Sequence, residues 1–130
     1  MNAANTANVY KNQQIMTASP EELILMLYNG AIRFISESIQ GLEQGNLEKA
    51  NNANLRAQNI VKEFVCALDM QYEIAQGYYK LYDYIEYRLI QANIKKDKSQ
   101  LEEAKTLLLD LRDTWVQAMK IAKTQRAVAR

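Results

Sequence analysis

The scarcity of chain-breaking residues limits the possible folds of this chain more than any other feature. One proline and four glycines are spread over 130 residues, whereas hairpins and sandwiches need turn residues every ~8–12 positions. The remaining positions are rich in Leu, Ala, Glu, Lys and Gln, which favour helix. A chain of this length suits a single domain. We therefore predict one all-α domain.

Apolar residues recur with a period near 3.6 in four long segments, and each segment has recognisable ends. The sequence Ser19-Pro20-Glu21-Glu22 predicts a helix start, since Ser19 and Glu22 can form a capping box and proline is tolerated at the first helical position. Gly41 and Gly45 are expected to end this helix. Asn46 is expected to cap the second helix. The predicted core positions of the second helix are Ala50, Ala53, Ala57, Ile60, Val61, Phe64 and Leu68.

The third segment follows a short link at residues 69–72, and the fourth follows a polar connection at residues 93–98. Ser99 and Glu102 repeat the capping-box pattern and predict the start of the fourth helix. Long helices joined by short links favour antiparallel neighbours. We expect an antiparallel up-down four-helix bundle over residues 19–125, with an extra amino-terminal arm or short helix at 1–18 and a frayed basic tail at 126–130. The inward positions are Ile74, Tyr78, Leu81, Ile85, Leu89 and Ala92, then Leu101, Ala104, Leu108, Leu111, Trp115, Ala118 and Ala122.

The commonest catalytic residue and the familiar catalytic motifs are missing from the sequence. Histidine, the commonest general base and metal ligand at neutral pH, does not occur. The sequence also lacks a glycine-rich phosphate loop, a CxxC pair and a calcium-loop pattern. The paired carboxylates Glu21-Glu22 and Glu102-Glu103 are expected in first helical turns, where they complement the helix dipole. We expect no catalytic residues, no metal and no cofactor, although a substrate-assisted enzyme of unknown chemistry is a remote alternative.

The charge balance argues against nucleic acid as a partner. Sixteen Lys plus Arg face fifteen Asp plus Glu, far from the basic excess that binds phosphates. The single cysteine, Cys66, has apolar neighbours, so we expect a buried, inert thiol in a reducing compartment. The amino end lacks the basic head and apolar run of a secretory signal, and no apolar stretch is long enough to span a bilayer. These features predict a cytosolic protein without membrane insertion.

Two features exceed what a plain bundle needs. Five tyrosines crowd the third segment at spacings that place some of them outside the core; an alternative is that they straddle its boundary with their hydroxyls in water. The run of six apolar residues at 23–28 is too wide to face one bundle centre. Neighbouring helices, the amino arm, another copy of the chain or an amphipathic partner segment could each cover the remainder. The tyrosines are Tyr78, Tyr79, Tyr82, Tyr84 and Tyr87.

Several short motifs, in order along the chain, resemble the flagellin export chaperones of the FliS family. Tyr10 also lies where that family usually has an aromatic residue. Gly77 and Tyr78, and the link at 69–73, depart from the family pattern and leave the start of the third helix open. The matching motifs are residues 17–23 (TASPEEL), 25–28 (LMLY), 30–32 (GAI), 57–60 (AQNI), 81–85 (LYDYI), 89–93 (LIQAN) and 111–115 (LRDTW).

The resemblance implies a chaperone that binds the disordered carboxy-terminal segment of flagellin, prevents premature polymerisation and helps to deliver it to a component of the flagellar export gate. It implies a mobile lid containing Val9, Tyr10 and Ile15. The alternative from a different class is a structural or regulatory helical module that forms a homodimer through the same apolar strip. The candidate flagellin-binding groove residues are Leu23, Leu27, Tyr28, Tyr82, Tyr84 and Asn93.

Overall fold

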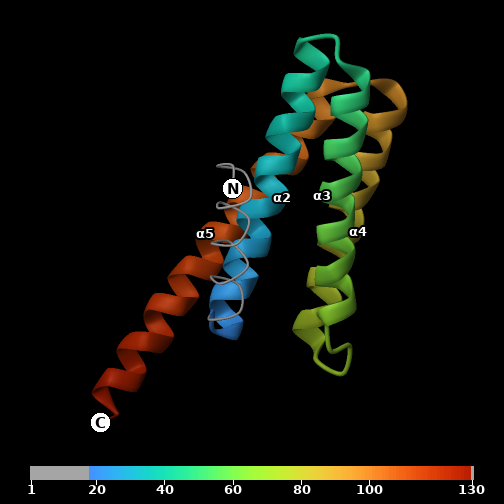
Figure 1. Cartoon of the computed structure of the whole chain (residues 1–130). Coiled ribbons are helices and arrows are strands. Elements are labelled where there is room, and N and C mark those ends of the chain that lie inside the picture. Colours follow the sequence, from blue (N-terminus) through green and yellow to red (C-terminus); the bar gives the residue numbers. More distant parts are fainter. Residues whose placement is uncertain (1–17, 130) are drawn as a thin grey trace, which may run out of the picture.

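The computed structural model describes residues 18–129, which form four helices and contain no strand. The helices are α2 (Pro20–Glu43), α3 (Leu47–Ala67), α4 (Glu73–Lys95) and α5 (Lys98–Val128). Both α2 and α4 pack against α3 and α5. Figure 1 shows successive helices running in opposite directions, with the end of α5 extending past the start of α2. The predicted all-α, up-down four-helix bundle is confirmed.

The start of α2 has the predicted capping box. Ser19 Oγ accepts a hydrogen bond of 3.2 Å from the Glu22 amide, and Glu22 Oε2 accepts one of 3.4 Å from the Ser19 amide. Pro20 occupies the first helical position, where a missing N–H leaves no bond unmade. Asn46 caps α3 as predicted, because its side chain accepts a hydrogen bond of 3.1 Å from the Lys49 amide. Sequence therefore fixes where these two helices begin.

The end of α2 differs from the prediction at one of its two glycines. Gly41 does not break the helix, which continues to Glu43. A Cβ atom at Gly41 would lie 2.6 Å from the backbone nitrogen of Ala50, so glycine allows α2 and α3 to approach closely there. Gly45 lies in the turn with a φ of +70° and ends the helical path as predicted.

Buried side chains grow in size along α3 as the bundle widens. Ala50, Ala53 and Ala57 line the end near the α2–α3 turn, and Val61 and Phe64 follow toward the other end. Figure 1 shows α2 and α3 diverging away from the turn that joins them. Small side chains permit the close approach and large ones fill the wider end, as dense packing requires. We call the end with the larger side chains the wide end of the bundle.

Polar side chains inside the bundle join α3 to α4. Asn54 Nδ2 donates a hydrogen bond of 2.9 Å to the Leu89 carbonyl, and Asn54 Oδ1 accepts one of 2.7 Å from Gln58. On α2, Ser38 donates to the Ala50 carbonyl over 2.8 Å. Within the described residues, no buried side-chain nitrogen or oxygen lacks a partner. These bonds offset the cost of burying polar groups.

The ends of α4 and α5 differ from the prediction. Ile74, expected inside, is 70% exposed, because the first turn of α4 directs its neighbour Ala75, 5% exposed, toward the core and Ile74 toward solvent. The α5 helix begins at Lys98 and is capped by Asp97, not by Ser99. Asp97 accepts a hydrogen bond of 2.9 Å from the Ser99 amide, and bonds from Ser99 and then Gln100 lower the pKa of Asp97.

This earlier start moves the pair Glu102-Glu103 out of the first turn of α5, so that the dipole role expected for it is wrong. The helix then continues to Val128, so residues 126–128 of the expected frayed tail are helical. Ala118 and Ala122, expected inside, are exposed because this part of α5 runs beyond the core.

Cys66 is exposed, and the expectation of a buried thiol is wrong. Its neighbour Phe64 points into the core, and a residue two positions further along a helix faces a different side. Apolar neighbours in sequence therefore did not indicate burial. Among the described residues, no helix has the length and apolar character that crossing a membrane requires.

Candidate functional site

Tyr28 and Tyr82 lie in the core at the wide end of the bundle, and each is 4% exposed. Their hydroxyl groups share a hydrogen bond of 2.8 Å that links α2 to α4. The Phe64 ring stacks on both tyrosine rings, with its centroid 4.5 Å from that of Tyr28 and 5.3 Å from that of Tyr82. Burial raises the pKa of both tyrosines above the usual range of this side chain.

Leu23 and Leu27 are half-buried and lie one turn apart on α2. Leu27 packs against the core cluster, as do Tyr78 of α4 and Trp115 of α5. This part of α2 is the apolar run at 23–28, of which only Tyr28 is fully buried. Neighbouring helices therefore cover the run in part and leave apolar area in contact with solvent.

Tyr84 is exposed and belongs to a polar cluster that joins α4 to α5. Its hydroxyl accepts a hydrogen bond of 2.8 Å from Arg88 Nε and donates one to Glu103. Arg88 Nε also lies 3.2 Å from Glu103 Oε2. The bond to Tyr84, followed by the charge of Glu103, raises the pKa of Arg88. The Arg88 guanidinium also lies over the Tyr84 ring, 5.1 Å from its centroid.

Asn93 is half-buried near the end of α4 and donates a hydrogen bond of 2.8 Å to Asn51 on α3. The six groove candidates therefore do not line one common surface: two are in the core, two are on α2, and Tyr84 and Asn93 lie at different helix contacts. The lid candidates Val9, Tyr10 and Ile15 fall outside the described residues.

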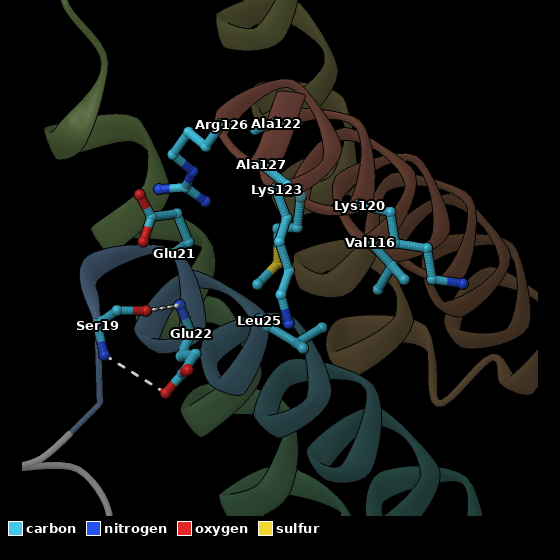
Figure 2. Close-up of a pocket in the computed structure, with 11 residues that line it drawn as sticks. Ser19, Glu21, Glu22, Leu25, Val116, Lys120, Ala122, Lys123, Arg126 and Ala127 are labelled. Atoms are coloured by element: carbon cyan, nitrogen blue, oxygen red, sulfur yellow. Dashed lines mark hydrogen bonds between the residues drawn. The ribbon is translucent and has the colours of Figure 1, made fainter. Parts of the chain in front are cut away.

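A pocket of about 670 Å³ lies between the start of α2 and the last turns of α5. Figure 2 shows Leu25 and Val116 approaching it from the two helices, with Glu21 and Glu22 on the α2 side and Lys123 on the α5 side. Trp115 Nε1 donates a hydrogen bond of 3.1 Å to the Glu21 carbonyl and fixes α5 against α2 beside the pocket. The full lining is Ser19, Glu21, Glu22, Leu25, Val116, Met119, Lys120, Ala122, Lys123, Arg126 and Ala127.

The pocket has an apolar floor between two charged edges. Leu25, Val116 and Met119 are half-buried and supply the floor. The α2 edge carries two carboxylates, and the α5 edge carries Lys120, Lys123 and Arg126. A surface of this kind suits the apolar stripe of an amphipathic peptide segment. We call it the α2–α5 pocket.

Sequence reasoning did not select the floor residues of this pocket. Leu25 belongs to the apolar run at 23–28, but the run gave no indication of which side its neighbours would leave open. Val116, Met119 and Lys123 recur at spacings of three and four, which place them on one face of a helix. That signal was present, but the face of this helix that carries Trp115, Ala118 and Ala122 was selected as the inward packing face instead.

The described residues contain no group of three or more His, Cys, Asp or Glu side chains that could hold a metal ion. The exposed Cys66 has no such companions among them.

Comparison with known proteins places this architecture in a family. The family model described as flagellar protein FliS matches residues 2–122. The flagellar secretion chaperone FliS of Bacillus subtilis (strain 168) is 38% identical over 94% of this chain and 92% of its own length. That of Salmonella typhimurium is 36% identical over 93% of this chain and 92% of its own length.

A solved structure supports the fold. A crystal structure described as that of a flagellar chaperone from bacteria superimposes with a TM-score of 0.72 at 18% identity, covering 88% of this chain and 98% of that one. At that identity the likeness speaks for the four-helix architecture, while the family match rests on sequence over nearly the whole length. The chain belongs to the FliS family of flagellar secretion chaperones.

Proposed function

We propose that this protein binds the disordered carboxy-terminal segment of flagellin in the cytosol, prevents its premature polymerisation and aids its delivery to the flagellar type III export apparatus. Membership of a secretion-chaperone family supports a client of the flagellin type. The observation that carries the proposal is the solvent-facing apolar floor of the α2–α5 pocket.

Physical chemistry fits this role. A segment that packs into a filament needs an apolar stripe, and that stripe must be covered before assembly if it is not to self-associate. Leu25, Val116 and Met119 offer an apolar surface to cover it. A disordered segment loses conformational entropy when it orders on the chaperone, so a wide contact can give moderate, releasable affinity. Neither a nucleotide nor a metal is required, and we expect no catalytic activity.

The direct test is a pull-down of purified flagellin by the full chain in physiological salt. Full-length flagellin should be retained, and flagellin lacking its last ~40 residues, the span that we expect to be disordered, should not. Equal retention of the two forms would exclude the carboxy-terminal segment as the bound element. If neither form of flagellin is retained, the proposal is overturned.

A substitution on the pocket floor provides a second prediction. Met119→Glu places a charge where the client's apolar residues would lie, and we expect its affinity for the flagellin segment to fall by about tenfold or more. Ile121→Glu is the matched control, because Ile121 is on the same helix, is 57% exposed and does not line the pocket. Isothermal titration calorimetry should show a change within about twofold for the control. An equal loss of affinity in both variants would show that client binding does not depend on this pocket.

The rival reading is a dimerisation module that is indifferent to flagellin. Light scattering distinguishes the two, since a chaperone should form a complex with the flagellin segment whose mass is the sum of the partners. A dimer whose mass is unchanged by the segment would favour the rival. Melting shifts produced by metabolites would point instead to a small-molecule site.

A further inference from the structure

The basic edge of the α2–α5 pocket carries charge that the protein itself leaves unmatched. Residues 114–130 contain four Lys or Arg and no Asp or Glu. Three of these cations, Lys120, Lys123 and Arg126, line the pocket and are exposed. Within residues 18–129, none of the three takes part in an ion pair. A ligand in the pocket therefore meets cations that have no ion-pair partner within the described residues.

Lys123 is the cation placed closest to the apolar floor. Figure 2 shows its ammonium group extending into the pocket toward Leu25, while Arg126 extends toward Glu21. Beside apolar atoms a charge is less screened than in open water, so a carboxylate that approaches Lys123 gains more than at an ordinary surface site.

The acidic edge of the pocket is engaged with its own helix. Glu22 accepts the Ser19 amide in the capping box, and both Glu21 and Glu22 lie in the first turn of α2, where they complement the helix dipole. Lys120 and Lys123 have no comparable local partner in the described part of the chain. The unmatched charge of the pocket is therefore positive.

The amino-terminal arm cannot supply the missing negative charge. Residues 1–17 contain Lys11 and no Asp or Glu. The arm is continuous with the chain next to Ser19, at the rim of the pocket. A segment of residues 1–17 is long enough to reach the floor from there. Its apolar residues can cover that floor, but its charge has the same sign as the basic edge. The best occupant of the pocket is consequently a segment of another chain.

We propose that the α2–α5 pocket selects an acidic amphipathic segment, whose apolar residues cover Leu25, Val116 and Met119 while its carboxylates pair with Lys120 and Lys123. The two lysines are three positions apart and thus share one face of α5, so the carboxylates should be three or four positions apart on a helical ligand. The inference rests on the proposed function in one respect, that this segment belongs to the export client. It adds the location of the binding site and the charge of the ligand that the site prefers.

The test uses two synthetic peptides of about 18 residues, long enough to span several helical turns. They have the same apolar stripe, and one carries Glu where the other carries Gln. Fluorescence anisotropy with the full chain should show about tenfold tighter binding of the Glu peptide at low salt, and that preference should shrink in ~0.5 M salt because screening weakens exposed pairs.

Charge-reversed proteins locate the effect. In Lys120→Glu/Lys123→Glu the preference for the Glu peptide should vanish or reverse. Lys80→Glu/Lys95→Glu changes the net charge by the same amount on α4, away from the pocket lining, and should keep the preference. Circular dichroism checks that both variants stay helical. Equal affinity of the wild type for the two peptides, or equal loss of preference in both variants, would overturn the inference.

Measuring the flagellin carboxy-terminal segment in the same series separates the two proposals. If it binds the wild type and the Lys120→Glu/Lys123→Glu variant equally, the proposed function stands and the pocket inference fails. If only the Glu peptide binds, and does so through the two lysines, the pocket reads acidic segments and flagellin is not the client. Failure of all ligands to bind would overturn both.

Discussion

Tyr28 and Tyr82 illustrate at the residue scale how the wide end of the bundle is held together. Each hydroxyl is buried and has the other as its hydrogen-bond partner, at 2.8 Å. Each of the two rings also stacks on the ring of Phe64. This arrangement links α2 and α4, which otherwise contact each other little because each packs mainly on α3 and α5. Loss of one hydroxyl should thus affect the neighbour as well.

We predict that Tyr82→Phe lowers the free energy of unfolding by about 1–3 kcal/mol, because the Tyr28 hydroxyl is left buried without a partner. Tyr28→Phe should behave in the same way. The double variant Tyr28→Phe/Tyr82→Phe should lose clearly less than the sum, since it leaves no unpaired hydroxyl. Urea denaturation measures all three. Additive losses would indicate that water replaces the missing partner.

The pH dependence of stability provides a control for this prediction. Burial raises the pKa of Tyr28 and Tyr82 in the folded protein. Above pH ~10 the unfolded tyrosines ionise while the folded ones stay protonated, so the unfolded state gains stability and the fold loses it as pH rises. Below that pH their contribution is fully present. The double phenylalanine variant should show a shallower loss above pH ~10 than the wild type.

At the scale of the helices, two glycines in helical segments have opposite roles. A Cβ at Gly41 would lie 2.6 Å from the Ala50 nitrogen and 2.9 Å from its Cα, both backbone atoms that cannot move independently. A Cβ at Gly77 would meet nothing within 4 Å. Gly41 thus sets the distance between α2 and α3, whereas Gly77 only weakens α4.

Alanine substitutions at these positions should therefore change stability in opposite directions. Gly41→Ala should destabilise the protein by about 1–3 kcal/mol, because the overpacking cost exceeds the gain in helix propensity. Gly77→Ala should stabilise it by up to about 1 kcal/mol, since only the propensity gain remains. Chemical denaturation of the two variants gives both values. A stable Gly41→Ala protein would mean that α2 and α3 can separate there without cost.

The helix features that depend on residues close together in sequence were predictable, and those that depend on distant residues were not. The capping box at Ser19 and the cap at Asn46 involve residues three positions apart, and both were predicted correctly. Gly41 was misread because a helix stop and a tight helix contact both call for a residue without a side chain, and only the position of Ala50 decides between them. Asp97 and Ser99 are both good caps, and sequence alone did not rank them.

The candidate site was harder to predict than the fold because it depends on how far α5 extends past its neighbours. The apolar run at 23–28 indicated spare surface, but Leu25 faces α5 while Leu23 and Leu27 lie on another side of the same helix. Tyr82 was a candidate for the surface and lies in the core. Periodicity reports which residues share a face, and it does not report which face stays open.

At the scale of the whole molecule, the wide end of the bundle combines the features that a client needs. Figure 1 shows the end of α5 continuing beyond the start of α2, and residues 120–129 are all exposed. Such a stretch has little packing to stabilise it as a helix. A segment bound in the α2–α5 pocket would contact both this stretch and the start of α2, and it would therefore stabilise the last turns of α5.

The amino-terminal arm reaches the bundle at this same end, and we propose that it covers the client site in the free protein. If the arm leaves the client site open in only about one per cent of the molecules, the apparent affinity for the client falls about 100-fold, or roughly 2.7 kcal/mol. Deletion of residues 1–16 should therefore tighten binding of the flagellin segment, which calorimetry measures. Replacing Val9, Tyr10 and Ile15 by Ser in the full chain is the matched control, because it keeps the arm's length and removes its apolar contacts. Tightening in both variants would identify an apolar lid, whereas unchanged or weaker binding on deletion, with the helices intact by circular dichroism, would contradict a lid that competes with the client.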